Sequence, residues 1–184
     1  ELNVFDSPSS DGTPITALSS FRDKILQFKQ DALYVINISN PTQFYTEASF
    51  RNCGVMNPCQ VFQAPFGVIF VNVFGCYIYD GSKVISLTSG KFTDVNWNIS
   101  EGSVVDASTS NSANNDNDAI NVPCVGYDPR SQSIIVLKDI GDNSTNTGAW
   151  VYNIGTQSWS EGTSMITNLN NATAGTGTRH SNFS

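Results

Sequence analysis

Residues 66–88 constrain the fold more than any other part of the chain, because they contain three short apolar runs separated by turn signals. The runs are residues 68–73, 76–79 and 83–87. They are interrupted at Phe74-Gly75 and at Asp80-Gly81-Ser82, and Gly or Asp-Gly supplies the positive φ that tight hairpin turns need. The pattern predicts an antiparallel β-meander. Its first run is almost continuously apolar, which predicts a strand covered on both faces and a meander that lies between two others.

A second hairpin is predicted nearer the N-terminus. Residues 23–30 and 33–38 are alternating runs separated by Asp31-Ala32, and we expect Phe28 together with either Ile25 or Leu26 to point inward. Residues 1–16 instead contain Asp-Ser-Pro and Asp-Gly-Thr-Pro turn signals and have little to bury. We therefore expect the first residues to connect this hairpin to other structure.

The second strands of the two hairpins share a pattern that recurs a third time. Residues 33–37 and 76–80 are 43 positions apart, and residues 149–153 follow after a further 73. Each copy has an aromatic second residue, a β-branched third residue and a terminal Asn or Asp, which we expect to cap the next turn. The aromatic residues are Tyr34, Tyr77 and Trp150, and the terminal residues are Asn37, Asp80 and Asn153. A strand over residues 133–138 precedes the third copy, and a strand anchored by Trp159 follows it.

A period near 43 with several strands per unit predicts an all-β chain of β-propeller blades built from antiparallel meanders. The alternative is a β-sandwich, which also needs short strands and many turns. We assign residues 1–20 to an N-terminal connecting segment and residues 21–162 to about three blades. The blades are 21–60, 61–102 and 122–162, with a loop insertion at 103–121 and a second insertion at 141–147. Residues 163–184 form a polar crossover or begin a further blade. Because propellers need about four to eight blades, we expect this chain to be an incomplete piece of one.

Charge and composition exclude several classes of partner. The net charge of −7 argues against a protein that binds the nucleic-acid backbone or an anionic membrane, since both need clustered Lys and Arg. We also expect no direct sequence-specific contact to nucleic acid. There is no apolar run near 18 residues, so we predict no membrane span, and no signal peptide is predicted. The four cysteines, Cys53, Cys59, Cys76 and Cys124, fit no zinc spacing, and we expect buried free thiols. A Cys53–Cys59 disulfide is the competing interpretation.

The sequence contains no recognisable catalytic motif. A glycosidase would need two carboxylates facing each other at a separation of roughly 5 Å or 6.5–9.5 Å. The candidates stand at strand ends or in turns, where capping is the preferred explanation for an acidic residue: Asp23, Asp80, Glu101, Asp128 and Asp139. The single histidine, His180, has no nucleophile elbow to serve, and we expect a solvated loop histidine. We therefore predict no catalytic, cofactor-binding or metal-ligating residue, and no cofactor.

Three further patterns have ordinary explanations. Oxygen-rich runs at residues 114–118 and at Asp142-Asn143 are compatible with calcium but lack the spacing of an EF-hand loop, so solvated low-complexity sequence is preferred. The Asn-x-Ser/Thr triplets at Asn98, Asn143 and Asn171 are expected by chance in so Asn-rich a chain. Tyr77, Trp150 and Trp159 recur at matched positions, which predicts core packing in preference to a sugar-binding platform.

Residues 21–39, Pro58-Cys-Gln-Val61 and residues 67–81 together resemble the propeller segments of virion structural proteins in tailed bacteriophages. That class includes tail nozzle, adaptor and stabilisation proteins. The resemblance covers about residues 21–88, and residues 127–162 resemble a looser, kelch-like blade without the double glycine of true kelch repeats.

The resemblance implies a non-enzymatic part of a symmetric tail assembly and supplies no catalytic residues. It implies a virion protein that is assembled in the host cytoplasm and contacts other tail subunits and copies of itself. The alternative function is a carbohydrate- or receptor-binding propeller that touches host-surface glycans, and a glycosidase-type enzyme is the third hypothesis.

Overall fold

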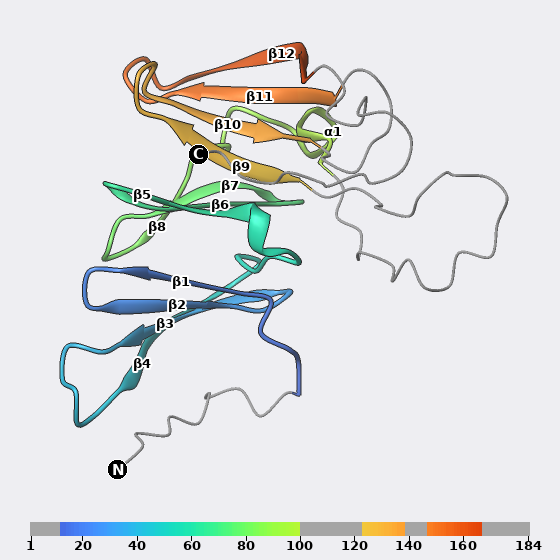
Figure 1. The fold of residues 1–184 in the computed structure, drawn as a ribbon. Helices are drawn as coiled ribbons and strands as arrows, with labels where there is room; N and C mark the ends of the chain where they lie inside the picture. The colour runs from blue at the N-terminus through green and yellow to red at the C-terminus, as the bar shows by residue number, and fades with distance from the viewer. Residues whose placement is uncertain (1–11, 100–122, 139–146, 167–184) are drawn as a thin grey trace, which may run out of the picture. The chain divides into compact units, whose positions relative to one another are not determined.

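The computed structural model describes residues 12–99, 123–138 and 147–166, and nearly all of its regular structure is β-strand (Figure 1). The strands form three four-stranded antiparallel sheets, and each sheet follows the order of its strands in the chain. The all-β, meander prediction is therefore confirmed. Sheets of this kind occur as propeller blades and in β-sandwiches, so the closed propeller stays a prediction. The chain divides into two compact units, residues 1–91 and 92–184.

The first sheet lies in the first unit and consists of β1 (Ala17–Phe21), β2 (Lys24–Phe28), β3 (Ala32–Asn37) and β4 (Tyr45–Arg51). The hairpin predicted over residues 23–38 corresponds to β2 and β3, and Leu26 points into the core with Phe28. The sequence predicts a connecting segment over residues 1–20, whereas residues 17–20 form most of β1. The sequence does not predict this strand because Ser19 and Ser20 interrupt its apolar pattern.

The second sheet also belongs to the first unit and consists of β5 (Val61–Ala64), β6 (Gly67–Asn72), β7 (Gly75–Tyr79) and β8 (Val84–Ser86). All six residues of β6 are buried, as its apolar sequence predicts. Val73 was expected in this strand but lies in the turn. Asn72 closes that turn, because its side-chain oxygen accepts hydrogen bonds from the backbone N–H groups of Phe74 at 2.9 Å and Gly75 at 3.2 Å.

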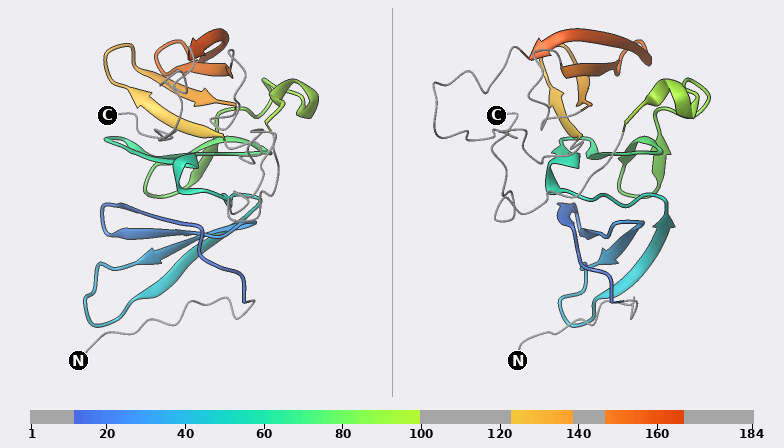
Figure 2. Two further views of the ribbon diagram at one scale, coloured as in Figure 1. Left: turned by 45° about the vertical axis from the view of Figure 1, so that its right-hand side comes forward. Right: turned by 90° about the vertical axis from the view of Figure 1, so that its right-hand side faces the viewer.

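The apolar faces of these two sheets pack on each other, and both views in Figure 2 show them as stacked layers. Phe28 of β2 meets Phe70 of β6 edge to face with ring centroids 5.2 Å apart. Phe70 also stacks on Tyr77 at 5.2 Å. Because such aromatic pairs add to the energy of burial, this contact anchors the core of the first unit.

Two buried polar side chains fasten the connection between the sheets. The connection contains the short 3₁₀ helix η1 (Pro58–Gln60). Gln60 is fully buried and donates from Nε2 to the Val71 carbonyl oxygen at 2.8 Å. Asn72 donates from Nδ2 to the carbonyl oxygens of Asn52 and Gly54 at 3.0 and 2.9 Å. These bonds satisfy backbone groups that a buried loop would otherwise leave unpaired.

The second unit holds the short helix α1 (Asp94–Trp97) and the third sheet. That sheet consists of β9 (Cys124–Asp128), β10 (Ser133–Leu137), β11 (Thr147–Asn153) and β12 (Ser158–Ile166). The strands predicted over residues 133–138 and 149–153 are β10 and β11, and Trp159 lies on β12 as expected. The predicted insertion at 103–121 lies outside the described residues, as do most of residues 141–147 and 163–184.

The expected turn caps are present in all three copies of the repeat. The side-chain oxygen Oδ1 of Asn37 accepts from the Ser39 N–H at 2.9 Å, and that of Asp80 accepts from the Ser82 N–H at 2.8 Å. Asn153 accepts in the same way from the Thr156 N–H at 2.9 Å. The terminal Asn or Asp of the repeat therefore determines where each of these strands turns.

The cysteines agree with the free-thiol prediction. All four are free, with Cys53, Cys76 and Cys124 buried and Cys59 half-buried. The competing Cys53–Cys59 disulfide is not formed. Burial raises the pKa of the Cys76 thiol far above its ordinary value, so this group stays protonated and unreactive at neutral pH.

Replacing Phe70 by Ala tests the packing between the two sheets. We expect the free energy of unfolding to fall by about 3–5 kcal/mol, because the change leaves a cavity between the sheets. The matched control is Phe74→Ala, since Phe74 is 62 % exposed, and it should change stability by less than about 0.5 kcal/mol. Urea unfolding followed by far-UV circular dichroism measures both. Equal effects of the two substitutions would contradict the packing described.

Candidate functional site

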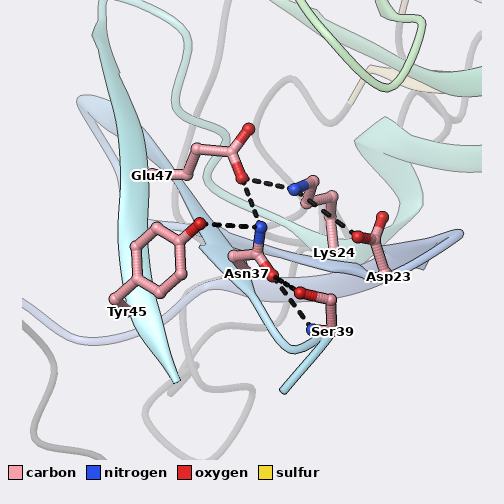
Figure 3. Close-up of polar contacts among 6 residues, drawn as sticks. All are labelled: Asp23, Lys24, Asn37, Ser39, Tyr45 and Glu47. Atoms are coloured by element: carbon pink, nitrogen blue, oxygen red, sulfur yellow. Dashed lines mark hydrogen bonds and ion pairs between the residues drawn. The ribbon is translucent and has the colours of Figure 1, made fainter. Parts of the chain in front are cut away.

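A network of polar side chains joins the ends of β2, β3 and β4 in the first sheet (Figure 3). We call it the Lys24 network, and its members are Asp23, Lys24, Asn37, Ser39, Tyr45 and Glu47. Lys24 forms an ion pair with Glu47 and lies 3.7 Å from an Asp23 carboxylate oxygen. The side chain of Lys24 is only 10 % exposed, whereas those of Asp23 and Glu47 are 49 % and 38 % exposed. The ammonium group is thus nearly buried beneath carboxylates that reach solvent.

Asn37 connects the remaining members of the Lys24 network. Its Nδ2 donates to Glu47 Oε2 at 2.7 Å and to the Tyr45 hydroxyl at 3.1 Å. Its Oδ1 accepts from the backbone N–H and the hydroxyl of Ser39 at 2.9 and 2.6 Å. One amide side chain therefore caps the turn after β3 and also links that strand to β4.

A β-bulge in β4 brings Glu47 to this position. The register pairs Val35 with Ala48 and Ile36 with Thr46, so Glu47 is an extra residue on β4. A bulge changes the face to which a side chain points. Here it lets Glu47 reach Lys24 and Asn37, which lie on the same face of the sheet. The sequence analysis missed this network because Lys24 and Glu47 are 23 residues apart and nothing in the local pattern marks a bulge.

The charges of the Lys24 network stabilise each other. The hydrogen bond to Glu47 raises the pKa of Lys24, against the opposing effect of burial. Hydrogen bonds from Lys24 and then Asn37 lower the pKa of Glu47 below its ordinary value. Both groups are therefore ionised at neutral pH, the amine without a free electron pair and the carboxylate without a proton. In this state the ion pair and its hydrogen bonds hold the ends of β2, β3 and β4 together.

The carboxylates considered for glycosidase chemistry have other partners. Hydrogen bonds from the backbone N–H groups of Lys83 and Ser82 lower the pKa of Asp80. Asp128 accepts from the Ser131 hydroxyl at 2.6 Å and from the Arg130 N–H at 3.0 Å, and these bonds lower its pKa. Both residues thus cap turns, as the sequence analysis preferred. Asp23 belongs to the Lys24 network, and Glu101 and Asp139 lie outside the described residues.

The aromatic residues of the third sheet form a packed cluster with the segment around α1. The indole Nε1 of Trp150 donates to the Trp97 carbonyl oxygen at 3.1 Å, and the Lys138 ammonium lies 4.4 Å from the Trp150 ring centroid. Phe92 packs edge to face on Trp150 and Trp159 at centroid distances of 4.8 and 5.4 Å. Tyr77 likewise stacks on Phe70. Tyr77, Trp150 and Trp159 are each half-buried, so they pack against other rings without belonging to the fully buried core.

Several other candidates lie outside the described residues: His180, residues 114–118, Asp142, Asn143 and Asn171. Asn98 is described and follows α1 with φ of 45°. Within residues 12–99, 123–138 and 147–166, no group of three or more His, Cys, Asp or Glu side chains is arranged to hold a metal ion. No helix among these residues is long and apolar enough to cross a membrane.

Comparison with known protein families found no matching family model, and a search of curated proteins found no similar sequence.

Replacing Glu47 by Gln tests the Lys24 network. Because folding lowers the pKa of Glu47, its ionised form contributes stability above the ordinary value of 4.5, and that contribution is lost as pH falls through the lowered pKa. The variant should therefore be less stable than the wild type at pH 7, and the difference should shrink in strongly acidic solution.

Urea unfolding between pH 2.5 and pH 7 measures this difference, with the exposed Asp31→Asn as the control in the same unit. A Glu47→Gln deficit that is the same at both ends of the pH range would show that the carboxylate charge is not what stabilises the network.

Proposed function

We propose that this chain is a non-enzymatic structural component of a bacteriophage tail. Its meander sheets are blades of a β-propeller, and its surface contacts neighbouring tail subunits and copies of itself in a symmetric assembly. The protein is then located in the virion, which is assembled in the host cytoplasm.

The observation that carries the proposal is the contrast between the charged and the apolar side chains of the first unit. Lys24, Glu47 and Asp80 are held in hydrogen bonds that fix strands and turns. The exposed positions instead include seven large apolar side chains. They are Ile15, Leu18, Tyr45, Phe66, Val73, Phe74 and Ile85. Contacts between permanent subunits depend on apolar area and shape, so a surface of this kind supports a structural role.

Val73 and Phe74 illustrate the point, because they are adjacent in the turn between β6 and β7. Their side chains are 38 % and 62 % exposed. Asn72 already closes this turn through its own hydrogen bonds, so the two apolar residues are not needed for the turn itself. The packed aromatic cluster of the third sheet gives no specific support to the carbohydrate-binding alternative.

Electron microscopy of the purified full-length gene product tests the proposal. A tail component should form rings or tubes of defined symmetry, either alone or when mixed with the other tail proteins of the same virus. A glycan array run on the same preparation should show no binding. A protein that stays monomeric with all tail partners present, or that binds a defined glycan, would contradict the proposal.

A further inference from the structure

The edge strands of the first unit differ in how they are protected from pairing with another chain. Natural sheets protect their edges with bulges, charged residues or very short strands. The edge strand β4 contains the bulge and the charged residues Glu47 and Arg51. The edge strands β5 and β8 have only four and three residues.

The remaining edge strand, β1, has none of these protective features. It has five residues and pairs with β2 without a register shift. The sequence contains no charged residue from Gly12 to Phe21. Its regular, uncharged edge is therefore the one in this unit that is best suited to accept a further strand.

The side chains of β1 divide into a buried and an exposed set. Ala17 and Phe21 are each 7 % exposed and belong to the core between the two sheets. Leu18 points the opposite way and is 64 % exposed, and the nearby Ile15 is 50 % exposed. Ser20 is exposed on the same side as Leu18. Strand β1 is therefore held in place by the buried Ala17 and Phe21, while Leu18 on its other face is exposed.

We propose that β1 is a self-association edge, along which a second copy of this chain pairs through its own β1. The net charge of −7 makes two copies repel, so a stable contact has to avoid placing like charges opposite each other. Antiparallel pairing about a two-fold axis sets the same segment against itself, and the uncharged residues 12–21 satisfy that condition. In such a pair, the exposed Leu18 side chain of each copy buries apolar area against the other copy. This contact concerns two copies in isolation and does not depend on the phage-tail proposal.

Sedimentation equilibrium of the full chain over a wide concentration range tests the inference. The wild type should show a reversible increase in mass from monomer to dimer. Leu18→Glu should weaken the association at least about tenfold, because it places like charges at the pairing edge and removes apolar burial. Gln43→Glu is the control, since Gln43 is exposed in the loop between β3 and β4, and it adds the same negative charge away from β1, so it should leave the dimer unchanged.

A second variant separates loss of pairing from loss of folding. Ser20→Lys keeps Leu18 and adds a charge on the same exposed side of β1, so it should also weaken the dimer while the circular dichroism spectrum and the unfolding transition stay like those of the wild type. A wild-type chain that remains monomeric at every concentration would overturn the inference. So would a dimer that Gln43→Glu weakens as much as Leu18→Glu, or one that neither β1 variant weakens.

Discussion

The packing of Phe28 on Phe70 is the contact on which the first unit depends. A single four-stranded meander has no second layer to bury its apolar face, so it needs another sheet to cover it. The two rings meet at the centre of the interface between the first and second sheets, and Tyr77 extends the stack. All six residues of β6 are buried, and Val68 and Phe70 of this strand lie in the interface with the first sheet.

Polar interactions at the strand ends stabilise the fold in addition to the apolar core. Apolar packing holds the sheets together, but it does not determine the residue at which each strand ends. Asn37, Asp80 and Asn153 end their strands because their side chains accept hydrogen bonds from backbone N–H groups in the following turns. The Lys24 network connects the ends of β2, β3 and β4. In it the positive charge of Lys24 is balanced by the negative charge of Glu47. Lys24, Glu47 and Asp80 thus stabilise the fold through hydrogen bonds within the first unit.

The sequence predicted the central strands better than the edge strands, for a physical reason. Strands β3, β6 and β7 are covered by neighbours and keep clear apolar patterns. Strand β4 was missed because Tyr45, Glu47, Ser49 and Arg51 face solvent and its inward residues are only half-buried. The turn caps could be predicted because an Asn or Asp bonds to backbone within three residues. The pairing of Lys24 with Glu47 could not, because it depends on a bulge and on a register that join distant parts of the chain.

We propose that this chain is a subunit of a symmetric assembly built from meander sheets. Electron cryomicroscopy of the native particle, at a resolution that separates β-strands, tests this proposal. We expect density for four-stranded meanders that repeat around a symmetry axis, with Phe28 and Phe70 between neighbouring sheets and apolar surface of the first unit in contact with other subunits. Density for this chain outside any symmetric particle, or a closed two-sheet sandwich with all of its exposed apolar residues in solvent, would contradict it.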